Sequence, residues 1–133
     1  MASVYDPPRD RVLTGLVPNG ESGGLASYSA DESQWTGGVS TPIPATESCF
    51  VYDTERSRVI QHGGFSGTLP LPLTAAFADA PLGLVLTNLG PRRGAHGMSY
   101  DLVRDRVVVF GGRDSTLAEK GDTWEFNGVD NSW

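Results

Sequence analysis

The chain has little cysteine, little positive charge and no long apolar run, and each shortage excludes a class of protein. Among the 133 residues there is one cysteine, Cys49, so an intramolecular disulfide and a cysteine-rich metal site are excluded. No stretch approaches the ~20 apolar residues that span a bilayer. The opening "MASVYDPPRD" has neither the basic nor the apolar segment of a secretory signal. These shortages predict a cytoplasmic protein with no membrane partner.

Basic residues are outnumbered, with 10 Lys and Arg against 16 Asp and Glu and a net charge of −6. A nucleic-acid-binding domain neutralises phosphates with clustered Lys and Arg, so no nucleic-acid partner is expected. Glycine and proline are plentiful instead, with 17 and 9 residues, while apolar residues still make up 38% of the chain. That mixture is typical of many short strands joined by tight turns.

Three stretches repeat the pattern Tyr-Asp-x-x-Arg-x-Arg-Val, beginning at Tyr5, Tyr52 and Tyr100, which are 47 and 48 residues apart. An aromatic residue follows each, and a Trp or Leu lies seven positions later. These landmarks recur every 49 residues and are Tyr28 and Trp35, Phe77 and Leu84, and Phe126 and Trp133. Landmarks that share one period indicate a tandem array. The single domain, 1–133, therefore divides into unit one (about 1–45), unit two (about 46–93) and unit three (about 94–133).

Each unit is predicted to contain four strands. The first ends at the Asp of the pattern, which favours a turn, and the second begins at the following Arg-Val. The third carries the aromatic landmark, and the fourth starts at the Trp or Leu. In units two and three the second strand ends at Gly63-Gly64 and Gly111-Gly112; glycine takes positive φ at low cost and permits close backbone approach. The one helical candidate, 116–122, is short and contains a glycine, so the class is all-β.

These features together resemble the kelch repeat, in which an apolar run ends in Gly-Gly and is followed by an aromatic residue and then a Trp. Unit three matches this pattern through Val107–Phe110, Gly111, Gly112, Phe126 and Trp133. Its lead-in also resembles the family's Pro-x-Arg-x-x-His opening, with Arg93 and His96 at the matching positions. Unit two has Leu84 in place of the Trp, and unit one lacks the glycine pair.

The resemblance implies that each unit forms one four-stranded antiparallel blade of a β-propeller. Kelch repeats serve in protein and carbohydrate recognition and occasionally as enzyme scaffolds, so the fold leaves the function open. Propellers close with 4–8 blades, and three units cannot close alone. We therefore expect a homodimer that forms a six-bladed propeller, in which unit three lacks most of its outer strand.

Side chains that recur in every unit are interpreted as parts of the fold. The arginine pairs 9/11, 56/58 and 104/106 are interpreted as solvated turns, and the periodic aromatic residues as packing between units. His62, which stands where unit three has Phe110, and His96 are interpreted first as hydrogen-bonded core residues. Two histidines in unlike strand positions make a poor zinc site. Neither a nucleophile elbow nor a phosphate loop is present, and no catalytic residue, metal or cofactor is predicted.

The candidate ligand-binding residues are Arg92, Arg93 and Arg113, with His62 and His96 beside them. The arginines lie in connections that are unlike between units, including the loops 16–24, 65–73 and 113–121, and rigid scaffolds present ligands with such loops. Three arginines on one face suit a carboxylate or an acidic peptide.

Three functions remain open at this point. The favoured one is a non-catalytic module that binds a protein, an acidic peptide or a glycan at the loop face around the central channel. The second is a small propeller enzyme, hydrolase-like or lyase-like, with His62 or His96 as acid–base and Arg92 as electrophile at the channel mouth. The third is an isolated or engineered fragment whose only activity is self-assembly. A metal at the channel mouth would favour the enzyme.

Overall fold

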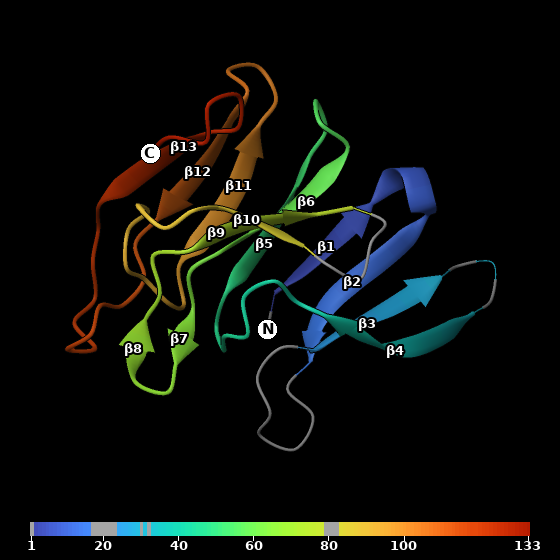
Figure 1. Cartoon of the computed structure of the whole chain (residues 1–133), viewed down its shortest axis with the longest axis horizontal. Helices are drawn as coiled ribbons and strands as arrows, with labels where there is room; N and C mark the ends of the chain where they lie inside the picture. Colours follow the sequence, from blue (N-terminus) through green and yellow to red (C-terminus); the bar gives the residue numbers. More distant parts are fainter. Residues whose placement is uncertain (1, 17–23, 30, 32, 79–82) are drawn as a thin grey trace.

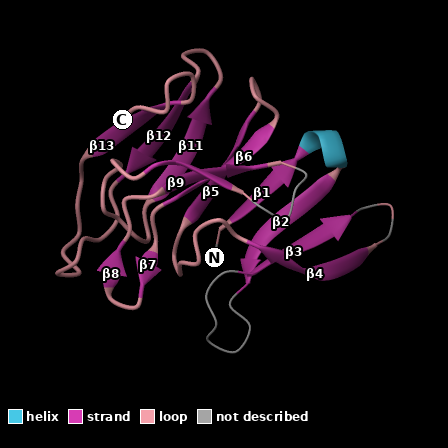
Figure 2. Ribbon diagram, in the orientation of Figure 1, coloured by secondary structure: helices cyan, strands magenta, loops and turns pink. Residues whose placement is uncertain are grey.

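The chain forms small antiparallel sheets in the computed structural model, which describes residues 2–16, 24–29, 31, 33–78 and 83–133. Figure 2 shows strands throughout and one short helical element, the 3-10 turn η1 (Pro7–Arg9). The prediction of an all-β chain is confirmed, and the candidate helix at 116–122 is turn and bridge structure.

Three of the sheets are up-and-down meanders that follow one another along the chain (Figure 1). The first sheet consists of β1 (Ser3–Asp6), β2 (Arg11–Leu16), β3 (Gly24–Ser29) and β4 (Gln34–Ser40). The second sheet consists of β5 (Cys49–Asp53), β6 (Arg58–His62), β9 (Thr74–Phe77) and β10 (Leu84–Thr87). The third sheet consists of β11 (Gly97–Asp101), β12 (Arg106–Phe110) and β13 (Thr123–Asn127). Strand β5 contacts both β1 and β11, so the first strands of the sheets lie side by side.

The three meanders share one register. In each, the Tyr of the repeated pattern lies opposite its Val, as in Tyr52 opposite Val59, and that Val lies opposite the aromatic landmark, as in Val59 opposite Phe77. The same pairs occur in the first and third sheets. The fourth strands differ, because Trp35 lies opposite Tyr28 whereas Leu84 lies opposite Ala76.

The middle sheet is buried on both faces because it lies between the first and third sheets. Side chains alternate along its strands, so each strand contributes to both faces. One face joins the first sheet in a cluster of Leu13, Leu25, Phe50, Val59 and Phe77. The other face joins the third sheet in a cluster of Val51, Ile60, Ala76, Val107 and Phe126. Adjacent residues such as Val59 and Ile60 therefore point to different neighbours, and the packing between sheets supplies the core.

Two further details concern units two and three. The segment 65–73, expected to be loop, contains an added hairpin of β7 (Phe65–Ser66) and β8 (Leu69–Pro70). In unit three the chain after β13 turns back through a bridge between Asn127 and Ser132, and the third sheet has three strands. The loop 16–24 falls almost wholly outside the described residues.

Candidate functional site

The two glycine pairs shape the end of the molecule that carries the candidate site. Gly63 and Gly64 have φ of 64° and 91°, and Gly111 and Gly112 have φ of 68° and 87°. A Cβ on Gly63 would lie 2.4 Å from the carbonyl oxygen of Arg93. Both reasons for glycine expected from the sequence, positive φ and close backbone approach, are therefore present. The turns let the connection at 88–96 pass directly against them.

Backbone hydrogen bonds join the connections at this end, which we call the loop end. The amide of Gly64 donates to the carbonyl of Arg93 (N–O 2.8 Å), and the amide of Arg113 donates to the carbonyl of Gly94 (N–O 2.9 Å). The amide of Ala95 donates to the carbonyl of Glu47 (N–O 3.0 Å). The loop end is therefore built jointly by units two and three, as the lower part of Figure 1 shows.

Two of the three predicted arginines are already paired with carboxylates. Arg93 Nη2 lies 2.9 Å from Asp122 Oδ2, and Arg113 Nη2 lies 2.7 Å from Glu47 Oε2. The pKa of Asp122 is lowered, mainly because its carboxylate accepts a hydrogen bond from the Trp124 indole. Burial opposes this shift, and the nearby Arg93 adds to it. Arg92 is exposed, and its carbonyl accepts a hydrogen bond from Arg93. The local positive charge expected from three arginines is thus partly neutralised, and Arg92 contributes most of it.

The two predicted histidines lie in the interior between the second and third sheets. His62 is fully buried; its Nε2 donates to the carbonyl of Pro91 (3.1 Å), so its Nδ1 accepts from the hydroxyl of Thr74 (3.0 Å). The Trp133 indole also donates to that hydroxyl and packs on His62, with ring centroids 4.5 Å apart. Burial, then the neighbouring His96, lowers the pKa of His62 to about 3.

His96 is 4% exposed and packs on His62 with ring centroids 5.3 Å apart. Burial, then Arg93, lowers its pKa to about 4. Both rings are neutral at physiological pH and covered, so a ligand at the loop end meets neither of them in this structure. Of the five predicted residues, Arg92 is exposed and the Arg113 side chain is 38% exposed, whereas the Arg93 side chain is 14% exposed.

An open pocket of about 470 Å³ lies at the loop end of the third sheet, beside the exposed ring of Phe110. Its lining includes Phe110, Gly111, Gly112, Arg113, Glu119 and Lys120. The lining combines an aromatic face with one acidic and two basic side chains, and no property of the sequence indicated it beforehand.

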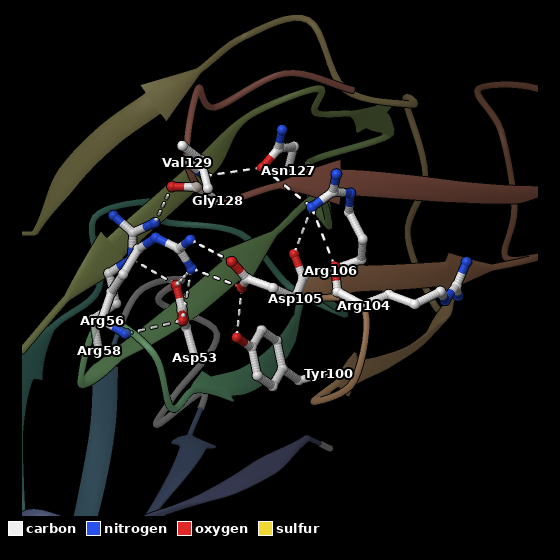
Figure 3. A network of polar contacts seen from close by, with 10 residues as sticks. All are labelled: Asp53, Arg56, Arg58, Tyr100, Arg104, Asp105, Arg106, Asn127, Gly128 and Val129. Carbon is white, nitrogen blue, oxygen red and sulfur yellow. Dashed lines mark hydrogen bonds and ion pairs between the residues drawn. The ribbon is translucent and has the colours of Figure 1, made fainter.

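The opposite end of the sheets carries an arginine–aspartate network at the turns that were expected to be solvated. Figure 3 shows the network between the second and third sheets. Asp53, with a side chain 1% exposed, accepts from Arg56 and Arg58, while Arg56 also binds Asp105 of the next sheet (Nη2–Oδ2 2.6 Å). Arg58 donates to the carbonyl of Gly128 (3.1 Å).

The first sheet has a matching arrangement, since buried Asp6 accepts from Arg9 and Arg11, and Arg11 reaches the carbonyl of Ala78 in unit two (3.2 Å). The structural role expected for these arginines fits this placement. The prediction that these arginines are solvated is wrong for units one and two. Their side chains are only 18–24% exposed, because they bind the buried carboxylates of Asp6 and Asp53. The recurring Asp in the pattern was the signal that could have revealed this.

No protein-family model and no curated protein matches this chain. Within the described ranges, no helix has the length and apolar character needed to cross a membrane. In the same part of the chain, no group of three or more His, Cys, Asp or Glu is arranged to hold a metal ion. The function is therefore inferred from the geometry of this chain alone.

Proposed function

We propose that this chain consists of three blades of a kelch-type β-propeller and acts as a non-catalytic recognition scaffold. One observation carries the proposal: a similar contact, from the second arginine of the pattern to a carbonyl one or two residues after the next unit's aromatic landmark, recurs from sheet to sheet. Arg11 of the first sheet donates to Ala78 O of unit two, and Arg58 of the second donates to Gly128 O of unit three. Similar contacts at successive junctions, together with first strands that lie side by side, are what neighbouring blades around one axis would make.

Two copies of the chain then complete a six-bladed ring. Three blades are fewer than the 4–8 that close a propeller, and three plus three falls within that range. The outer faces carry exposed aromatic side chains, with Trp35 58% and Tyr5 50% exposed on the first sheet and Phe110 57% exposed on the third. Exposed apolar surface of this kind marks association. Light scattering should give twice 14.2 kDa, and a stable monomer of single mass would contradict the dimer.

The ligand that the loop end fits best is an anionic peptide or glycan. Arg92 is exposed, and Arg113 is paired with the exposed carboxylate of Glu47, a kind of pair that contributes little stability. A ligand carboxylate can therefore replace Glu47 and gain a bidentate contact with Arg113. Recognition at this end needs no proton transfer from the buried histidines.

Titration calorimetry at low salt with a hexaglutamate peptide, an oligogalacturonate and a neutral oligosaccharide tests this function. We expect binding of one or both acidic probes and about a tenfold loss with Arg92→Ala. The control Arg9→Ala removes an equal charge at the other end of the sheets, outside the contacts between copies, and should change affinity little. Equal losses in the two variants would contradict a site at Arg92, because simple charge attraction would then explain the binding.

A further inference from the structure

The junction between the second and third sheets shows how one sheet of this chain receives the next. Three side chains of the second sheet contact unit three: Arg56 binds Asp105 (2.6 Å), Arg58 binds Gly128 O (3.1 Å), and His62 lies under Trp133 (4.5 Å between ring centroids). We call this set the forward contacts, because they point toward the sheet that follows in the chain.

The third sheet presents the same three positions on its open face. In the shared register, Arg104, Arg106 and Phe110 are equivalent to Arg56, Arg58 and His62. The Phe110 ring is 57% exposed, whereas His62 is fully buried. The Arg104 side chain is 53% exposed and binds Asp101 and Glu125 of its own sheet. The open pocket of about 470 Å³ adjoins Phe110, where the second sheet is instead covered by Trp133.

The first sheet presents the matching receiving positions. Asp10 is equivalent to Asp105, and both have left-handed backbone, with φ of 43° and 52°. Each accepts from the tyrosine of its own unit, Tyr5 or Tyr100, with O–O distances of 2.5 and 2.6 Å. The carboxylate of Asp10 is therefore held in the pose in which Asp105 receives Arg56.

The aromatic part of the receiving face is equivalent as well. Trp35 packs on Tyr28 with ring centroids 5.2 Å apart, as Trp133 packs on Phe126 at 5.4 Å. Trp133 covers His62, whereas Trp35 is 58% exposed. The first sheet thus presents the carboxylate of Asp10 and the indole of Trp35. These are the counterparts of the two groups, Asp105 and Trp133, that contact the second sheet.

We propose that a second copy of this chain docks its first sheet head to tail on the third sheet, so that Arg104 binds the partner copy's Asp10 and the partner copy's Trp35 covers Phe110. This inference rests on the proposed six-bladed assembly and specifies its interface. Opposite charges meet at one end of the interface, and apolar rings meet beside the pocket at the other. Two such contacts related by a twofold axis close a ring of two chains.

Charge reversal on each side tests this pairing with full-length chains, by light scattering and sedimentation over a concentration series. Arg104→Asp alone and Asp10→Arg alone should each weaken the dimer about 100-fold, because each homodimer then has like charges at both contacts. An equimolar mixture of the two variants should restore the dimer, because each of its contacts again joins opposite charges. Glu55→Arg is the control, since it lies in the equivalent turn of the middle sheet.

Asp10→Asn provides a second variant that tolerates the left-handed backbone if Asp10→Arg fails to fold, and it should weaken the dimer about tenfold. Restoration by the mixture, with both single variants monomeric and folded by circular dichroism, supports the pairing. Single variants that stay dimeric overturn this interface and leave the six-bladed assembly standing. A wild-type monomer or trimer overturns the two-chain ring, and a mixture that stays monomeric overturns the head-to-tail contact.

Discussion

The two junctions between neighbouring sheets are built differently. The first junction is apolar at its centre, where Phe50 and Phe77 of the middle sheet meet edge to face with centroids 6.4 Å apart, and a Cβ added to Gly15 would lie 3.5 Å from the Phe50 ring. The second junction adds a buried polar layer to its apolar cluster, with His62 and His96 in van der Waals contact. The stability gained from apolar packing depends on the buried area, whereas the stability of a buried polar cluster depends on every hydrogen-bond partner being in place.

The comparison teaches that one repeat pattern supports two kinds of packing. Where unit one has Gly15, unit two has His62, and the larger polar ring requires the indole of Trp133 and the hydroxyl of Thr74 beside it. The second junction is therefore expected to be more sensitive to backbone changes and to pH than the first. Three predictions follow this difference from the largest effect to the smallest.

Gly63→Ala should be the most damaging change, because it fills the space through which the connection passes at the second junction. Its matched control is Gly67→Ala: the two glycines have φ of 64° and 61°, but a Cβ on Gly67 meets nothing within 4 Å. The control should lose about 1–2 kcal/mol from left-handed backbone alone.

Gly63→Ala should lose at least ~3 kcal/mol more than the control, since a Cβ there would lie 2.4 Å from Arg93 O and the backbone must move. Urea unfolding of both variants measures the difference. Equal losses would show that backbone conformation alone, without close approach, explains the glycine.

Acid should weaken the second junction before it affects the first. The pKa of His62 is about 3 in the folded chain and 6.5 ordinarily, so between these values the unfolded chain binds a proton that the folded chain excludes. The free energy of unfolding is therefore highest above pH 6.5 and declines as the pH falls toward 3. By pH 5 the loss is about 2 kcal/mol for His62, and His96 adds a loss of similar size.

His62→Phe, which copies Phe110 of unit three, removes one titrating group and should reduce the loss between pH 7 and pH 5 by about 2 kcal/mol. The control at the first junction, Phe50→Leu, should lower stability equally at both pH values. Urea unfolding at pH 7, 6 and 5 tests this, and an unchanged pH slope in His62→Phe would contradict the role of the buried imidazole.

Ser57→Asp should stabilise the protein by about 1 kcal/mol. The Tyr52 hydroxyl is buried and has no hydrogen-bond partner among the described residues, whereas the equivalent Tyr5 and Tyr100 donate to Asp10 and Asp105. Ser57 already has the left-handed backbone of those aspartates, with φ of 48°. Thermal unfolding measures the gain. In a Tyr52→Phe background the gain should disappear, and a gain that persists there would contradict a hydrogen bond as its cause.

Much of the fold followed from the sequence because its signals are local and repeated. The repeated Tyr-Asp pattern and the periodic aromatic landmarks predicted the strands of each unit, and Gly111-Gly112 predicted a turn of positive φ. The β7–β8 hairpin was missed, since Phe65 and Leu69 lie in a segment that has no counterpart in the other units. The sequence also predicted that Arg92, Arg93 and Arg113 lie at one end of the molecule, because the predicted strands place their connections there. Backbone hydrogen bonds join these connections in the structure.

What the sequence determined by itself is the set of strands that recur in the three units, because side-chain alternation and glycine turns act over a few residues. Only the tertiary structure decided which groups are available for binding. It paired Arg93 with Asp122 and Arg113 with Glu47, partners that are 29 and 66 residues apart in the chain. It also buried His62 beneath Trp133. Charge and burial depend on neighbours brought together by the packing of one sheet on the next, and no local pattern contains that information.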